Sequence, residues 1–124
     1  MRRRLAALVA AVTVSLGSVT ACSGDDYCAR LKDYAAEFEG KDFTSSAVKA
    51  DLRQAAEKVA KSAPAELQDD WKAVFAYDDA LRGAGGDSAK LRDVLKQDGG
   101  KASAASRTIE EQAEGTCHVK LPNT

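Results

Sequence analysis

The sequence predicts a small all-α protein, and three observations support this prediction. Apolar side chains recur at alternating spacings of three and four residues in successive segments, which is the period of a helix with one buried face. The chain has only two prolines, so few positions interrupt a helix. No segment shows the apolar–polar alternation that is typical of a strand. The length of 124 residues fits one domain rather than two.

The first two expected helices are each marked by an apolar face. One spans residues 26–39, and its face carries Tyr27, Leu31, Tyr34 and Phe38. The other begins after a cap at Thr44, Ser45 or Ser46 and ends before Pro64, because the residue before a proline disfavours helical backbone. Its face carries Val48, Leu52, Ala55, Ala56 and Val59.

The third expected helix uses Pro64 in its first turn, where the missing N–H is not needed. Its broad face carries Leu67, Trp71, Val74, Phe75, Asp78 and Leu81, of which Asp78 is the one charged member. After the glycines of "GAGGD", Ser88 is expected to cap a short helix over residues 88–98, which Gly99 and Gly100 end. A last helix over about residues 101–114 ends at Gly115, and an extended tail follows.

The N-terminal stretch "MRRRLAALVAAVTVSLGSVTAC" has the pattern of an export signal. Three arginines precede thirteen uncharged residues from Leu5 to Gly17, which is the length of a signal-peptide core and is shorter than a membrane-spanning helix. The alternative is a permanent membrane helix with a cytoplasmic arginine cap. Small and hydroxyl residues weaken the second half of such a helix, namely Ser15, Gly17, Ser18 and Thr20.

The four residues Val19, Thr20, Ala21 and Cys22 resemble the lipobox of bacterial lipoproteins. In that family a diacylglycerol is attached to the cysteine thiol, and a dedicated peptidase cuts just before the cysteine. The resemblance implies that residues 1–21 are removed and that Cys22 becomes the lipidated first residue, followed by a tether over residues 22–25. Two acyl chains give stable attachment, so the domain is expected on the extracytoplasmic face of the cell membrane. An ordinary secretory signal with an incidental cysteine is the alternative.

The three cysteines are Cys22, Cys28 and Cys117. If Cys22 is lipidated, as the resemblance implies, the other two remain as a pair in an oxidising compartment where disulfides persist. Two free buried thiols or a metal pair are the alternatives, and the single histidine, His118, leaves a tetrahedral zinc site short of ligands.

A Cys28–Cys117 bridge brings the start and the end of the domain together, which an up-and-down bundle allows only with an even number of full-length helices. The predicted fold is therefore a small four-helix bundle over residues 26–121, with residues 88–98 as a short extra crossing helix before the last helix. Residues 122–124 form a tail, and the termini are joined by one disulfide.

No catalytic residues, cofactor or metal ion are expected. His118 follows Cys117 directly, but a bridged cysteine cannot act as a nucleophile. The acidic pairs Asp25–Asp26, Asp69–Asp70 and Asp78–Asp79 are interpreted as solvated helix surface, because Ca²⁺ needs about six to eight converging oxygens. When Arg2, Arg3 and Arg4 are left out, the chain has 15 basic and 19 acidic residues, and the basic residues form no cluster. This composition argues against nucleic acid as a partner.

Two hypotheses for function follow, beside a third, an enzyme or inhibitor whose class the sequence does not indicate. The first is a non-enzymatic ectodomain that binds or scaffolds an envelope protein, and a filled core with an exposed apolar patch would favour it. The second is a carrier or sensor of a small apolar ligand held between the helices, which an interior pocket of several hundred cubic ångströms would favour. The candidate groove residues for this second role are Tyr27, Tyr34, Trp71 and Tyr77.

A looser resemblance covers residues 22–121. A Tyr27–Cys28 opening, a helix start with Ala63, Pro64, Leu67 and Trp71, and the closing Cys117 resemble small helical lipoproteins of actinobacteria. This resemblance implies a membrane-anchored helical domain and transfers no functional residue.

Overall fold

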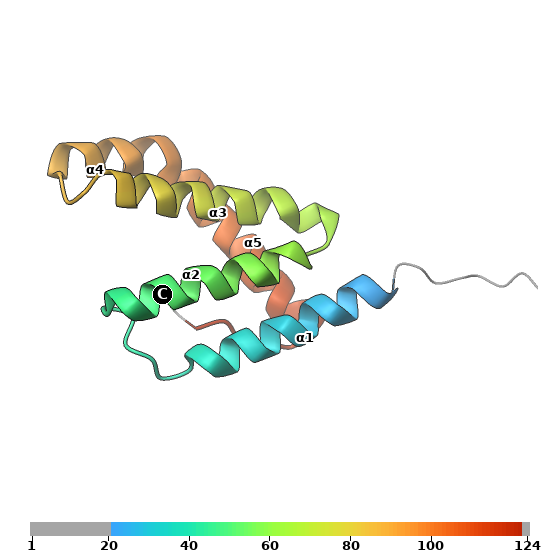
Figure 1. Ribbon diagram of the computed structural model, residues 1–124. Helices are drawn as coiled ribbons and strands as arrows, with labels where there is room; N and C mark the ends of the chain where they lie inside the picture. Colours follow the sequence, from blue (N-terminus) through green and yellow to red (C-terminus); the bar gives the residue numbers. More distant parts are fainter. Residues whose placement is uncertain (1–20, 123–124) are drawn as a thin grey trace, which may run out of the picture.

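The computed structural model in Figure 1 describes the backbone of residues 21–122 and the side chains of residues 26–122. Most of the expected signal peptide, residues 1–20, lies outside the described residues. All regular secondary structure from residue 21 to residue 122 is helical, which confirms the all-α prediction for this part. The elements are α1 (Ala21–Phe38), α2 (Ser46–Lys61), α3 (Ala65–Gly83), α4 (Ser88–Val94), the π-helical segment η1 (Leu95–Gly99) and α5 (Gly100–Cys117).

The helices form two antiparallel hairpins (Figure 1). α1 packs against α2, and α3 packs against the helical run that α4, η1 and α5 make together. α5 also contacts α1, so it ties the two hairpins into one helical bundle. The largest core side chains come from α1, α2, α3 and α5 and are Tyr27, Leu31, Tyr34, Phe38, Val59, Leu67, Trp71 and Ile109.

A disulfide joins Cys28 in α1 to Cys117, the last residue of α5, with the two Cα atoms 5.0 Å apart. The predicted bridge is confirmed. After Cys117 the chain turns at His118, whose φ of 55° is left-handed, and continues without regular structure. The side chain of Val119 is buried in the core and Leu121 packs against it, so the tail covers the bundle.

The glycine pair Gly99–Gly100 does not end a helix, so the expected crossing helix over residues 88–98 is wrong. Both glycines have helical backbone angles, and the helix continues from Ser88 to Cys117 through the five-residue π-helical turn of η1. Each glycine costs about 1 kcal/mol relative to alanine inside a helix, which tertiary packing can override. Here α5 lies along α3 and buries Ala102 and Ala105, and this packing outweighs the local preference for a break.

The starts of three helices also differ from expectation. α1 begins at Ala21 rather than at residue 26, so residues 22–25, expected as a tether, have helical backbone. Pro64 precedes α3 as its N-cap instead of lying in the first turn. Asp87 rather than Ser88 caps α4, because its side chain accepts hydrogen bonds from the N–H groups of Ala89 and Lys90 at 2.9 and 3.1 Å.

The end of α5 lies two residues beyond the expected stop at Gly115. A helix often ends where one residue adopts the left-handed conformation, and glycine does so at least cost. In this chain His118 takes that conformation, and the N–H of Val119 donates to the carbonyl of Ala113 at 3.0 Å. The bridge at Cys117 and the burial of Val119 hold the chain in this turn.

Within residues 21–122, no helix combines the length and the apolar character that crossing a membrane requires.

Candidate functional site

A groove of about 620 Å³ lies between α2 and α3, at the end where α2 begins and α3 ends. This volume falls in the range of small-molecule sites in proteins. Most of the lining is apolar and comprises Tyr34, Phe43, Ala50, Leu52, Ala56, Trp71, Val74, Phe75 and Leu81. The polar lining residues are Ser46, Lys49, Arg53, Asp78 and Arg82.

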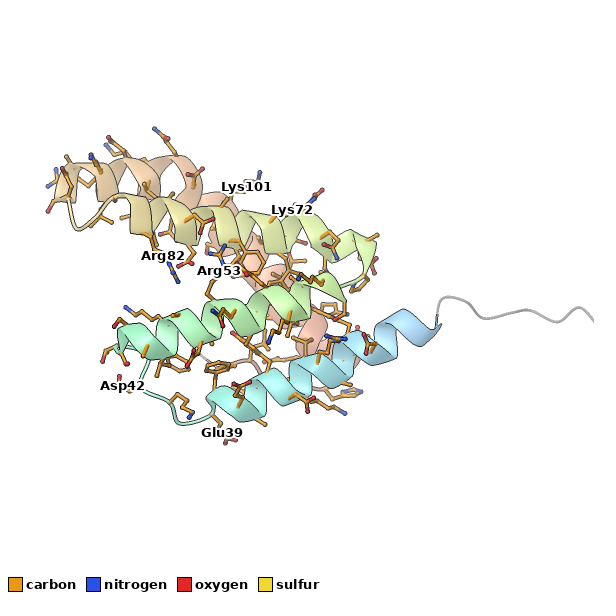
Figure 2. All side chains as sticks on the ribbon, in the orientation of Figure 1. Glu39, Asp42, Arg53, Lys72, Arg82 and Lys101 are labelled. Atoms are coloured by element: carbon orange, nitrogen blue, oxygen red, sulfur yellow. A yellow bond between two sulfur atoms is a disulfide. The ribbon has the colours of Figure 1, made fainter. Side chains whose placement is uncertain are left out.

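The two helices meet at the short connection between them. The side-chain amide of Gln68 in α3 donates to the carbonyls of Ala60 and Ala63 at 3.0 and 2.8 Å. These hydrogen bonds hold the end of α2 to the start of α3. Farther from this connection, the long side chain of Arg53 spans from α2 to α3 (Figure 2). α2 and α3 are therefore joined at two places: by the hydrogen bonds of Gln68 near their connection, and by the charged side chain of Arg53 farther along.

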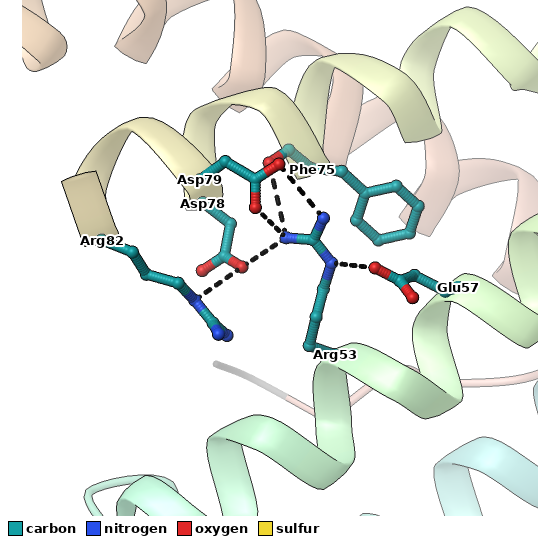
Figure 3. Close-up of polar contacts among 6 residues, drawn as sticks. All are labelled: Arg53, Glu57, Phe75, Asp78, Asp79 and Arg82. Carbon is teal, nitrogen blue, oxygen red and sulfur yellow. Dashed lines mark hydrogen bonds and ion pairs between the residues drawn. The ribbon is translucent and has the colours of Figure 1, made fainter.

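Arg53 is the centre of an ion-pair cluster (Figure 3). Its Nη1 donates to Oδ2 of Asp78 at 2.6 Å and to Oδ1 of Asp79 at 3.0 Å, and its Nε donates to Oε1 of Glu57 at 2.7 Å. The same oxygen of Asp78 accepts from Nε of Arg82 at 3.1 Å. The side chains of Asp78 and Asp79 are 38% and 66% exposed, so they are solvated as expected, but the sequence did not indicate that both carboxylates also connect α3 to α2.

The Arg53 side chain is only 16% exposed, and its guanidinium lies 4.5 Å from the ring centroid of Phe75. Burial lowers the pKa of this guanidinium, but hydrogen bonds to Asp79, Glu57 and Asp78 outweigh burial and raise the pKa above its ordinary value. Arg53 thus stays charged. A charged group in this position is stable because it is surrounded by three carboxylates, the carbonyl oxygen of Phe75 and the face of the Phe75 ring.

Three aromatic side chains that line the groove, Tyr34, Trp71 and Phe75, are held in place by contacts within the core. Trp71 is 5% exposed, and its Nε1 donates to the hydroxyl of Tyr27 at 3.1 Å. The rings of Trp71 and Phe75 lie 5.7 Å apart, a common spacing for aromatic pairs. Burial raises the pKa of Tyr34 to about 12, so this side chain is neutral at physiological pH. This side of the groove is therefore a rigid, uncharged surface.

The four candidate groove residues from the sequence occupy three different environments. Tyr34 and Trp71 line the groove. Tyr27 is fully buried beneath Trp71, and the half-buried Tyr77 is not among the lining residues. The sequence reasoning missed Arg53, although Asp78 on the otherwise apolar face of α3 was the signal that a cation lies opposite.

No group of three or more His, Cys, Asp or Glu side chains in residues 26–122 is arranged to hold a metal ion. His118 is exposed, and its neighbour Cys117 is bonded to Cys28. The groove lining holds one carboxylate, Asp78, which already pairs with two arginines. The chemistry available in the groove is therefore apolar contact with fixed charges at one end.

No family model, curated protein or solved structure matches this chain.

Proposed function

We propose that the mature protein is a lipid-anchored, extracytoplasmic domain that binds a small apolar ligand between α2 and α3. The observation that carries this proposal is the largely apolar groove of about 620 Å³. Small-molecule sites combine an apolar lining with a few polar groups that orient the ligand, and the groove has this composition. The proposed role is binding or carriage rather than catalysis, and the two hairpins serve as a four-helix bundle that holds the groove in shape.

The alternative role as a scaffold for an envelope protein receives less support. A docking surface for another protein is usually a contiguous exposed apolar patch. Among residues 26–122, Leu95 is the only large apolar side chain that is mostly exposed, with 54% of its surface accessible. A single exposed leucine is ordinary for a soluble surface, whereas the groove is large.

The position of the groove suits a domain that is attached to a membrane by Cys22. Cys22 lies in the first turn of α1, whereas the polar lining residues lie at the start of α2 and the end of α3, the opposite end of the hairpins (Figure 1). The 18 residues of α1 extend over about 27 Å at 1.5 Å per residue. We expect the groove to open away from the anchored end.

Leu81→Gln is expected to weaken the binding of a neutral apolar probe, N-phenyl-1-naphthylamine, roughly tenfold. Leu81 lines the groove, and replacing its apolar side chain with an amide removes apolar contact that the neutral probe would make. The measurement is a fluorescence titration of residues 22–124 with Cys22→Ser, which retain all described side chains and the disulfide. Leu91→Gln is the matched control, because Leu91 is half-buried on α4 and is not a lining residue. If the unaltered groove shows no saturable binding, or if both variants bind equally, the proposed function is wrong.

Cys22→Ala is expected to abolish lipid attachment in a bacterium that processes lipoproteins. The acylated atom is the thiol of this cysteine, so cells given labelled palmitate should label the unaltered protein and leave the variant unlabelled and precursor-sized. Ser23→Ala is the control and should be labelled and cut normally. A labelled or mature-sized Cys22→Ala variant would show that Cys22 is not the anchor.

A further inference from the structure

We infer that the groove selects a single-chain amphiphile with an anionic head, specifically a medium- or long-chain carboxylate, with its head at Lys49 and Arg82. This inference rests on the proposed function and goes beyond it by naming the charge and shape of the ligand. It draws on three features of the groove: the position of all its polar lining residues at one end, the two cations there that keep free N–H groups, and the start of α2.

All polar side chains of the groove lie at one of its ends, together with some apolar ones, and the other end is lined by apolar side chains alone. Ser46, Lys49 and Arg53 come from the first turns of α2, and Asp78 and Arg82 come from the last turns of α3. Because the two helices are antiparallel, these five residues lie at the same end (Figure 1). Deeper lining comes from apolar side chains such as Ala56, Trp71 and Val74. A ligand that is apolar at one end and polar at the other matches this order.

The three cations at the polar end, Arg53, Arg82 and Lys49, are balanced in number by three carboxylates, but two of these cations keep N–H groups without a partner among the described residues. Arg53 is committed to Glu57, Asp78 and Asp79, and the carboxylate of Asp78 is compensated by two arginines. Arg82 uses only its Nε within the described residues, and its side chain is 52% exposed. Lys49 makes no ion pair within 4.0 Å among residues 26–122. Two cations are therefore available to an incoming anion.

The start of α2 also favours an anion at this end. The first N–H groups of a helix have no partner within the helix, and together with the helix dipole they favour a nearby anion. Ser45, the N-cap of α2, makes no side-chain hydrogen bond to these groups, and the adjoining Ser46 lines the groove. A carboxylate at this end would meet Lys49, Arg82 and the first turn of α2 together.

The test uses the intrinsic fluorescence of Trp71, which is the only tryptophan and lies in the groove wall. Residues 22–124 with Cys22→Ser are titrated below micelle formation with decanoate, decan-1-ol, decyltrimethylammonium and decyl phosphate. We expect decanoate to bind about tenfold more tightly than decan-1-ol, and the cation to bind most weakly. From octanoate to dodecanoate, each added methylene that is buried should raise affinity about fourfold.

The double variant Lys49→Gln/Arg82→Gln should bind decanoate about as weakly as decan-1-ol and should bind decan-1-ol with unchanged affinity. Lys58→Gln/Arg92→Gln is the matched control, because neither residue lines the groove, and it should change neither affinity. Equal binding of decanoate and decan-1-ol, or an unaltered preference in the double variant, overturns the inference while N-phenyl-1-naphthylamine binding still upholds the proposed function. Much tighter binding of decyl phosphate than of decanoate overturns the assignment of a carboxylate. If the groove binds neither amphiphiles nor the neutral probe, the proposed function falls as well.

Discussion

Replacing both Cys28 and Cys117 with alanine is expected to lower the free energy of unfolding by about 2–5 kcal/mol. The bridge connects residues 89 positions apart and ties α1 to the end of α5, so it restricts nearly the whole domain when the chain unfolds. Alanine is chosen because Cys117 is 3% exposed, and a serine hydroxyl there would be buried without a partner. The measurement is urea unfolding of residues 22–124 with Cys22→Ser, followed by far-ultraviolet circular dichroism.

A reductant provides the control for this prediction. It should move the unfolding midpoint of the unaltered domain to that of the double-alanine variant and should leave the variant unchanged. Intact-mass measurement should show that reduction adds two hydrogens to the unaltered domain. A midpoint that is insensitive to reductant would show that the bridge contributes nothing to stability.

The second large effect is expected for Trp71→Ala, which should cost about 3–5 kcal/mol of unfolding free energy. Trp71 is 5% exposed, and its removal leaves a cavity beside Phe75 and takes away the hydrogen-bond partner of the buried Tyr27 hydroxyl. A small domain has a total stability of only about 5–15 kcal/mol, so the variant should be partly unfolded or should unfold at much lower urea concentration.

Two further variants separate the causes of this loss, with circular dichroism as the readout. Trp71→Phe keeps most of the apolar volume and removes the indole N–H, so it should cost less than Trp71→Ala. Tyr77→Ala truncates a half-buried aromatic on the same helix and should cost the least of the three. If Tyr77→Ala destabilises the domain as much as Trp71→Ala, then Trp71 is not the central packing residue of α3.

The dual position of Trp71 in the core and in the groove has a consequence for binding. A side chain that is locked by core packing and by a hydrogen bond to Tyr27 does not lose further freedom when a ligand arrives. The ion pairs of Arg53 also limit movement of the groove, because they hold α2 and α3 together near its polar end. The proposed site is thus organised without a ligand.

Helix faces were predictable because the pattern that marks them is local. Tyr27, Leu31, Tyr34 and Phe38 are all buried, as the spacing on α1 predicted. The disulfide was predictable because the lipobox resemblance accounts for one of three cysteines and leaves a single pair. Gly99 and Gly100 misled the prediction because their local cost, about 1 kcal/mol each, is small beside the packing of α5 on α3.

The sequence by itself determined that residues 21–122 are helical and which faces are apolar, and together with the lipobox resemblance it predicted that Cys28 pairs with Cys117. These properties depend on spacing within one helix or on the number of cysteines. Only the tertiary structure decided that α4, η1 and α5 form one continuous helix and that Arg53 pairs with Asp78 and Asp79. It also decided that Trp71 and Tyr34 line a groove, whereas Tyr27 and Tyr77 do not. Those outcomes depend on how far each helix is rotated and separated from its neighbours. That rotation and separation result from packing between residues far apart in the chain, which no local pattern records.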